Sequence, residues 1–123
     1  MANPFCHIEL QTGDAGKAKS FYGELFDWKL EDMPMGGDMT YTMVDVGEDG
    51  TGGGITPKMS EHAPTAWMPY VLVDDVSAST EKAKSLGGQI IAEKTEIPNM
   101  GWFSIITDPT GATVGLWQAA NPG

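Results

Sequence analysis

The chain has 123 residues, of which 41% are hydrophobic and 20% charged, so its length and composition fit one globular domain with a core of its own. Seven Lys and Arg against 17 Asp and Glu give a net charge of −10, which repels phosphate backbones and argues against a nucleic-acid partner. The single cysteine, Cys6, excludes an internal disulfide and suits the reducing cytoplasm, and we expect neither a secretion signal nor a membrane span.

The first half of the chain predicts one helix and four short strands. A strand over residues 4–11 is followed by Asp14 as a helix N-cap and by apolar residues at helical spacing, which predict a helix over 15–27. Three stretches separated by Gly, Pro and Asp clusters then predict three strands. These stretches are residues 28–32, 41–46 and 52–58.

The second half repeats this order. A strand at 67–73 precedes a capped helix within 74–88, and three more strands follow at 89–94, 102–108 and 113–119. Corresponding turns, helix ends and apolar positions lie at one fixed spacing of 61 residues, as Leu25 and Leu86 or Ile55 and Leu116 illustrate. We therefore predict an internal duplication within a single domain, with module one at 1–58, a linker at 59–64 and module two at 65–123.

The fold class predicted from this order is α+β, with two βαβββ modules that form an open, cupped mixed sheet with helices on its outer face. Alternation along the strands assigns Ile8, Leu10 and Val44 to the helix side. A second set of residues is assigned to the opposite, cup-facing side. This set is His7, Glu9, Met43, Met68, Tyr70, Trp102, Gly115 and Trp117.

Three stretches of the chain resemble the vicinal oxygen chelate superfamily, which includes glyoxalases, bleomycin-resistance proteins and extradiol dioxygenases. They are HIELQTGDAGKAKSFYGELFDWK, VLVDDVSASTEKAKSLGG and ITDPTGATVGLWQ, which look like the first strand and helix, the second strand and helix, and the closing hairpin of that family. The resemblance covers nearly the whole chain. It implies paired βαβββ modules around a cup, and it implies a homodimer.

The resemblance also implies where a metal ion would bind. Carried over to this chain, the ligand positions on the first and last strands of the two modules fall on His7, Gly54, Met68 and Gly115. Only His7 is a good ligand for a divalent cation, because methionine is a soft, weak donor and glycine has no side chain. We therefore expect no metal cofactor, with a divalent cation held by His7 and Glu9 as the alternative.

Three roles for His7 stay open at this stage. It could be a hydrogen-bonded structural histidine, a metal-free acid or base oriented by Glu9, or one of two metal ligands. A neighbouring carboxylate would raise its pKa and burial would lower it, and the sequence does not decide between the two.

The large apolar residues of the cup-facing set suggest what the cup binds. Met43, Met68, Tyr70, Trp102 and Trp117 would line it with thioether and aromatic surface, suited to a small, largely apolar or aromatic organic molecule. The sequence thus predicts a small-molecule-binding protein that works without the usual metal, like the drug-resistance members of the family. The alternative is a metal-dependent lyase or dioxygenase that uses His7 and Glu9 as catalytic residues.

Overall fold

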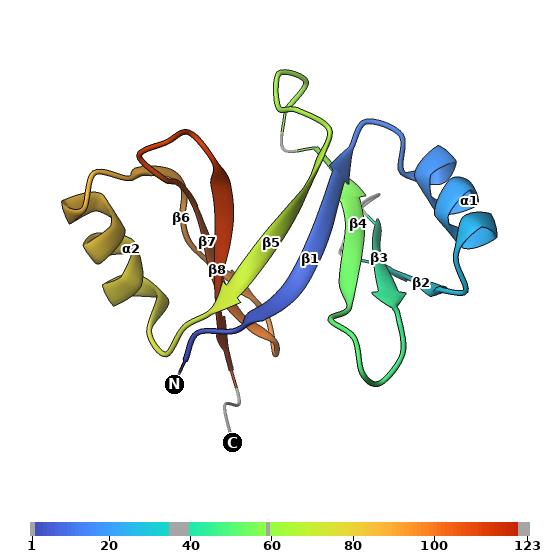
Figure 1. The fold of residues 1–123 in the computed structure, drawn as a ribbon, viewed down its shortest axis with the longest axis horizontal. Helices are drawn as coiled ribbons and strands as arrows, with labels where there is room; N and C mark the ends of the chain where they lie inside the picture. Colours follow the sequence, from blue (N-terminus) through green and yellow to red (C-terminus); the bar gives the residue numbers. More distant parts are fainter. Residues whose placement is uncertain (1, 35–39, 59, 121–123) are drawn as a thin grey trace. The chain divides into compact units, whose positions relative to one another are not determined.

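The computed structural model of the chain describes residues 2–34, 40–58 and 60–120. Its elements follow the order β-α-β-β-β twice (Figure 1). They are β1 (Phe5–Thr12), α1 (Ala15–Leu25), β2 (Lys29–Pro34), β3 (Thr40–Asp45), β4 (Gly53–Pro57), β5 (Ala66–Leu72), α2 (Val76–Ser85), β6 (Gln89–Ile97), β7 (Gly101–Thr107) and β8 (Thr113–Ala119). Residue 59, the first of the predicted linker, lies outside the described residues.

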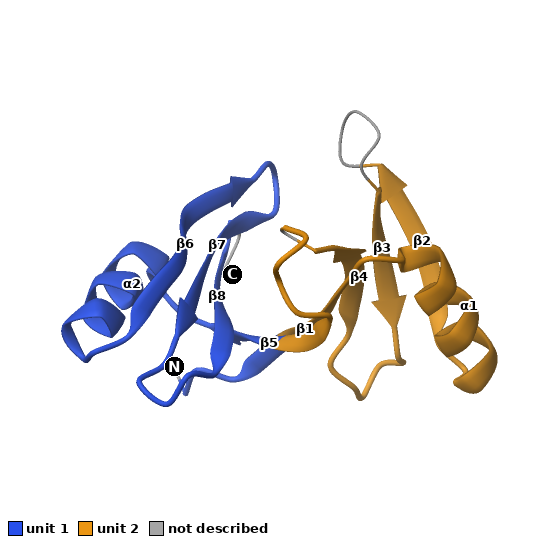
Figure 2. Cartoon of the chain, turned by 90° about the horizontal axis from the view of Figure 1, so that it is seen from above, with its two compact units in different colours: residues 1–6, 69–123 blue, residues 7–68 orange. Residues whose placement is uncertain are grey.

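The chain divides into two compact units (Figure 2), which we call unit 1 (residues 1–6 and 69–123) and unit 2 (residues 7–68). In unit 2 the strands are ordered β2-β3-β4-β1, and only the β1–β4 pair is parallel. Leu10, Val44 and Ile55 form a buried cluster on the face that α1 covers. Asp14 caps the helix by accepting a hydrogen bond from the Lys17 amide, as the sequence predicts.

Unit 1 has the same topology, with strand order β5-β8-β7-β6 and one parallel pair, β5–β8. Its core cluster consists of Val73, Val76 and Leu116, on the face covered by α2. A polar pair is buried in the same face, where the Thr80 and Ser104 hydroxyls lie 2.8 Å apart. The Thr80 hydroxyl is also 2.6 Å from the Val76 carbonyl oxygen, so both hydroxyls are satisfied.

The spacing of 61 residues is present in the structure as well as in the sequence. The helices α1 and α2 begin at residues 15 and 76. The parallel strand pairs share the same register, since Glu9 is opposite Gly54 in unit 2 and Tyr70 is opposite Gly115 in unit 1. The predicted α+β fold with two βαβββ sets in a mixed, open sheet is therefore confirmed. The cup between them and the single-domain boundaries stay predictions.

The predicted orientation of Trp102 is wrong. It is opposite Gln118 and two residues from Ser104, so it lies on the helix side of unit 1, where it packs against the core cluster. The residue on the other face is Phe103, opposite Trp117. Alternation misleads here because Ser104, a polar residue, is fully buried on the helix side by its hydrogen bond to Thr80.

Several segment boundaries also differ from expectation. The first helix ends at Leu25 rather than residue 27, because Phe26 is extended and its amide hydrogen-bonds the Tyr22 carbonyl as a C-cap. Strand β6 continues to Ile97, where it pairs with Gly101. No helix among the described residues is long and apolar enough to cross a membrane.

Candidate functional site

Three polar side chains meet on the face of unit 2 that points away from α1. His7 and Glu9 lie two residues apart on β1, so both point to that face. Tyr41 reaches them from β3, two strands away, with its phenol oxygen 2.6 Å from His7 Nε2 and 3.1 Å from Glu9 Oε1. The predicted pair His7 and Glu9 is thus joined by a third residue that the sequence analysis did not select.

Proton counting gives this network a direction. The Tyr41 phenol has one proton, which it donates to Glu9, so the proton of the 2.6 Å bond is carried by His7 Nε2. The second carboxylate oxygen of Glu9 accepts a hydrogen bond of 3.0 Å from the Gln11 side-chain amide. Glu9 is only 8% exposed, and the hydrogen bonds from Tyr41 and Gln11 replace those that its carboxylate would make to water.

Burial decides the electrostatics of His7. Loss of water lowers the pKa of His7, and the opposing effect of the Glu9 charge is the smaller of the two. The imidazole is therefore neutral at pH 7, which leaves it able to donate a hydrogen bond without introducing a buried positive charge. Of the two opposite shifts left open by the sequence, the lowered pKa is the one the structure supports.

Tyr41 can cross the sheet because β4 has no side chain in its way. A Cβ atom at Gly54 would overlap the Tyr41 ring. In unit 1 a tyrosine from a different strand covers the corresponding glycine, since a Cβ atom at Gly115 would overlap the ring of Tyr70 on β5. In both units a tyrosine ring occupies the space directly above the glycine of the closing strand.

This packing bears on the metal set that the family resemblance implies. A carboxylate at Gly54 or Gly115 would have to displace a tyrosine ring, so the residues present do not fit that set. Across residues 2–34, 40–58 and 60–120, no group of three or more His, Cys, Asp or Glu side chains is placed to hold an ion. The side chains that meet at this face are the His7 imidazole, the Tyr41 phenol and the Glu9 carboxylate.

The other predicted ligand-binding residues are distributed over the two units. In unit 2, Met43 is opposite Gly54 and shares the face of His7, while Met68 is buried. In unit 1, Tyr70 is buried with its ring 6.4 Å from that of Phe103, and Trp117 is partly buried on the same face. The Lys94 ammonium group lies over the Trp102 ring, 5.3 Å from its centroid.

Sequence reasoning missed Tyr41 and Phe103. Tyr41 is two residues before Met43 on one strand, so the alternation that selected Met43 could have selected it too. Phe103 was missed because Trp102 was placed on the wrong face.

The fold and motifs have a match among known families. Residues 5–116 match the family model described as "Glyoxalase/Bleomycin resistance protein/Dioxygenase superfamily". The chain belongs to this superfamily. The resemblance inferred from the three motifs is therefore confirmed, and the His7 face of unit 2 is the candidate site of a glyoxalase-superfamily protein.

Individual relatives agree with this assignment. The chain is 41% identical over 115 residues to "Putative glyoxylase CFP32" of Mycobacterium bovis, a match that covers 91% of this chain and 44% of that protein. It therefore spans less than half the length of this curated relative.

Solved structures of other proteins share the fold. The protein BH1468 from Bacillus halodurans C-125 has a TM-score of 0.71 with 18% identity, covering 100% of this chain and 99% of its own. Methylmalonyl-CoA epimerase from Mycobacterium tuberculosis has a TM-score of 0.69 with 14% identity, covering 95% and 88%.

Proposed function

We propose that this glyoxalase-superfamily protein binds a small, largely apolar or aromatic organic molecule at the His7 face of unit 2, without the metal set usual in the family. One observation carries the proposal: the Tyr41 phenol lies above Gly54 and is hydrogen-bonded to both His7 and Glu9. The bound molecule would then meet a hydrogen-bonded cluster of imidazole, phenol and carboxylate instead of an ion.

The surroundings of the cluster support an apolar ligand. Met43 shares this face, and its flexible thioether adapts to ligands of irregular shape. A few polar groups within an apolar surface are typical of small-molecule sites, where the polar groups orient the ligand and the apolar ones supply most of the affinity.

Two measurements test the proposal. Elemental analysis of protein purified without chelators and without a nickel column should find less than stoichiometric metal. A panel of small neutral aromatic molecules, screened by the shift of the unfolding temperature, should include binders. Tyr41→Phe should weaken such a binder about fivefold, the loss expected for one hydrogen bond of about 1 kcal/mol.

The control is Lys82→Ala on the exposed surface of α2, which should leave binding unchanged. Equal affinity in wild type, Tyr41→Phe and His7→Ala would contradict the proposed site.

The second candidate function is a metal-dependent lyase or dioxygenase that uses His7 and Glu9. It is favoured by the convergence of His7 Nε2 and Glu9 Oε1 on one atom, the Tyr41 oxygen. Stoichiometric Zn, Fe, Mn or Ni in the purified protein, lost in His7→Ala, would establish this alternative and contradict a metal-free site. The homodimer stays a proposal as well, which sedimentation at micromolar concentration would test.

A further inference from the structure

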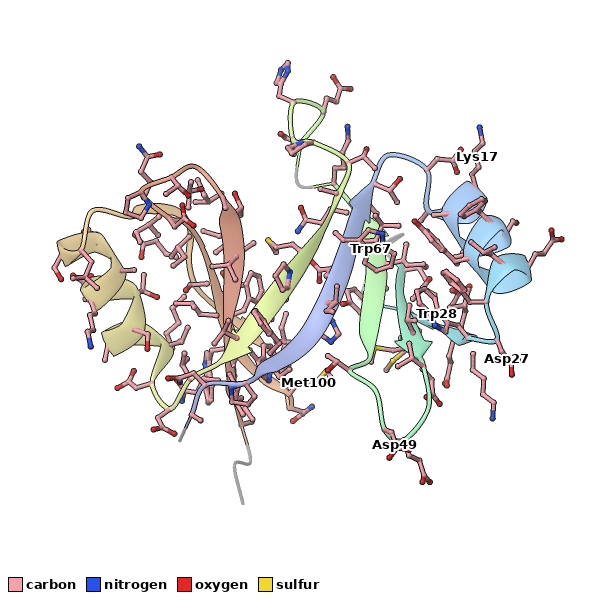
Figure 3. All side chains as sticks on the ribbon, in the orientation of Figure 1. Lys17, Asp27, Trp28, Asp49, Trp67 and Met100 are labelled. Carbon is pink, nitrogen blue, oxygen red and sulfur yellow. The ribbon has the colours of Figure 1, made fainter. Side chains whose placement is uncertain are left out.

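Unit 2 carries a cluster of aromatic residues on its helix side, opposite the face of His7. We call Tyr22, Phe26, Trp28 and Trp67 the aromatic corner. The Trp28 and Trp67 rings are nearly perpendicular, with an interplanar angle of 80° and centroids 6.1 Å apart. Figure 3 shows both tryptophans beside α1.

The rings of the corner are held in place by their neighbours. Tyr22 stacks on Trp28 with ring centroids 5.7 Å apart, and the centroid of the Phe26 ring lies 4.8 Å from that of Trp28. Trp67 donates its indole N–H to the Tyr22 hydroxyl at 3.2 Å. Two perpendicular indole planes are thus fixed before any ligand binds, which lowers the entropic cost of binding.

The duplicated fold supplies an internal control for this cluster. Because α1 and α2 begin 61 residues apart, Phe21 and Tyr22 correspond to Lys82 and Ala83. The segment after α2, Leu86–Gly88, has no aromatic residue, whereas Phe26–Trp28 after α1 has two. Unit 1 therefore has the same topology without aromatic residues at these positions, whereas in unit 2 Tyr22 and Trp28 pack against the core cluster and Phe21 is 58% exposed.

A small cavity opens beside the corner. Its volume is about 180 Å³, and its apolar walls are Ile8, Trp28, Val44, Val46 and Trp67, with Thr51 and the glycine backbone of 52–53 completing it. Ile8 and Val44 are both opposite Gly53, so the cavity lies on the other side of the sheet from Glu9 and Met43, which are opposite Gly54. A cavity of about 150 Å³ is known to hold benzene, so this volume admits one aromatic ring.

Charge near the cavity argues against an anionic ligand. None of its lining residues is basic. Glu48 and Asp49 precede Thr51 in the turn between β3 and β4. Trp28 has Asp27 on one side in the sequence and Lys29 on the other (Figure 3 labels Asp27, Trp28 and Asp49). Acidic side chains repel a carboxylate, whereas indole faces attract a cation.

We propose that this cavity is a second binding site, which takes one small planar ring that is neutral or positively charged. It is independent of the His7 face and holds its ligand by stacking against one indole and edge contact with the other.

Nuclear magnetic resonance of the full chain tests this proposal, because the protein has four tryptophans and each gives one indole N–H signal. Benzyl alcohol, benzylammonium and benzoate serve as probes, since they share a ring and differ in charge. The Trp28 and Trp67 signals, identified from single Trp→Phe variants, should shift with the first two probes. The Trp102 and Trp117 signals are internal references and should not follow the same titration. Benzoate should bind at least about fivefold more weakly at low salt.

Variants separate this site from the one proposed on the other face. Val46→Phe fills the cavity and should weaken the benzyl alcohol titration of the Trp28 and Trp67 signals at least about tenfold, while Tyr41→Phe and His7→Ala should leave this titration unchanged. Trp67→Leu removes one wall and should also weaken binding, which keeps the test valid if Val46→Phe fails to fold.

Three results would overturn the proposal. The first is that the Trp28 and Trp67 signals do not shift when benzyl alcohol is added at millimolar concentration in at least about 10-fold excess over the protein. The second is that benzoate binds as tightly as benzyl alcohol. The third is a dimer at micromolar protein concentration that buries both tryptophans. The last result would show that a second copy of the chain covers this surface.

Discussion

The two units of this protein share one topology and differ in how their helices meet the sheet. In unit 1, α2 buries Val76 and Thr80, and its outward positions are Lys, Glu, Ser and Ala. In unit 2, α1 has no fully buried residue and exposes Phe21 and Leu25 by more than half. The shared features specify the fold, and the features found in one unit alone indicate where binding sites should be sought.

Both units have a tyrosine ring packed over a glycine of the closing strand. Disrupting this packing should have the largest effect on stability. Gly54→Glu forces the Tyr41 ring out of its place and should lower the free energy of unfolding by about 3 kcal/mol or more, since overpacking displaces neighbours. Urea denaturation measures the change. Gly115→Glu should also be destabilising, because a side chain there overlaps the Tyr70 ring.

A double variant provides the control for that prediction. Tyr41→Ala combined with Gly54→Glu restores the space, so it should be more stable than Gly54→Glu alone. A double variant no more stable than the single one would show that the ring is not the obstacle.

The buried polar pair belongs to unit 1 alone and gives an intermediate effect. Thr80→Val removes a hydroxyl that bonds Val76 and Ser104, leaving the Ser104 hydroxyl buried without this partner. We expect a loss of about 2 kcal/mol in the free energy of unfolding. Adding Ser104→Ala should recover part of it, because both partners are then apolar. Full additivity of the two losses would contradict the pairing.

The pH dependence of stability should show the smallest effect, and it belongs to unit 2. Burial lowers the pKa of His7, so between its folded pKa and about 6.5 the unfolded chain binds more protons than the folded one. Stability is then fully present above pH 6.5 and declines as the pH falls through this window. Thermal unfolding at pH 5 to 7 should show a shallower decline for His7→Gln than for wild type. An identical decline in both would exclude His7 as its source.

Most of the fold follows from local pattern. Asp14 and Asp75 cap the two helices, and the repeated spacing of 61 residues reveals the duplication without any knowledge of contacts. Alternation failed at Trp102 because a hydrogen-bonded serine occupies a core position, a circumstance that hydrophobicity alone does not reveal.

The site was less accessible to sequence reasoning than the fold. His7 and Glu9 were selected because neighbours on one strand share a face by simple counting. Tyr41 was missed because its contact with them spans two strands and depends on the empty space above Gly54, which is a property of strand order.

The single thiol offers a way to observe motion at the start of β1. Burial raises the pKa of Cys6, whose sulfur lies 3.7 Å from the Tyr70 carbonyl oxygen. Only the thiolate reacts with alkylating reagents, so at neutral pH this residue reacts slowly while the strand stays paired. The rate of Cys6 alkylation, measured by mass spectrometry, therefore reports how often this strand opens, and no label needs to be introduced.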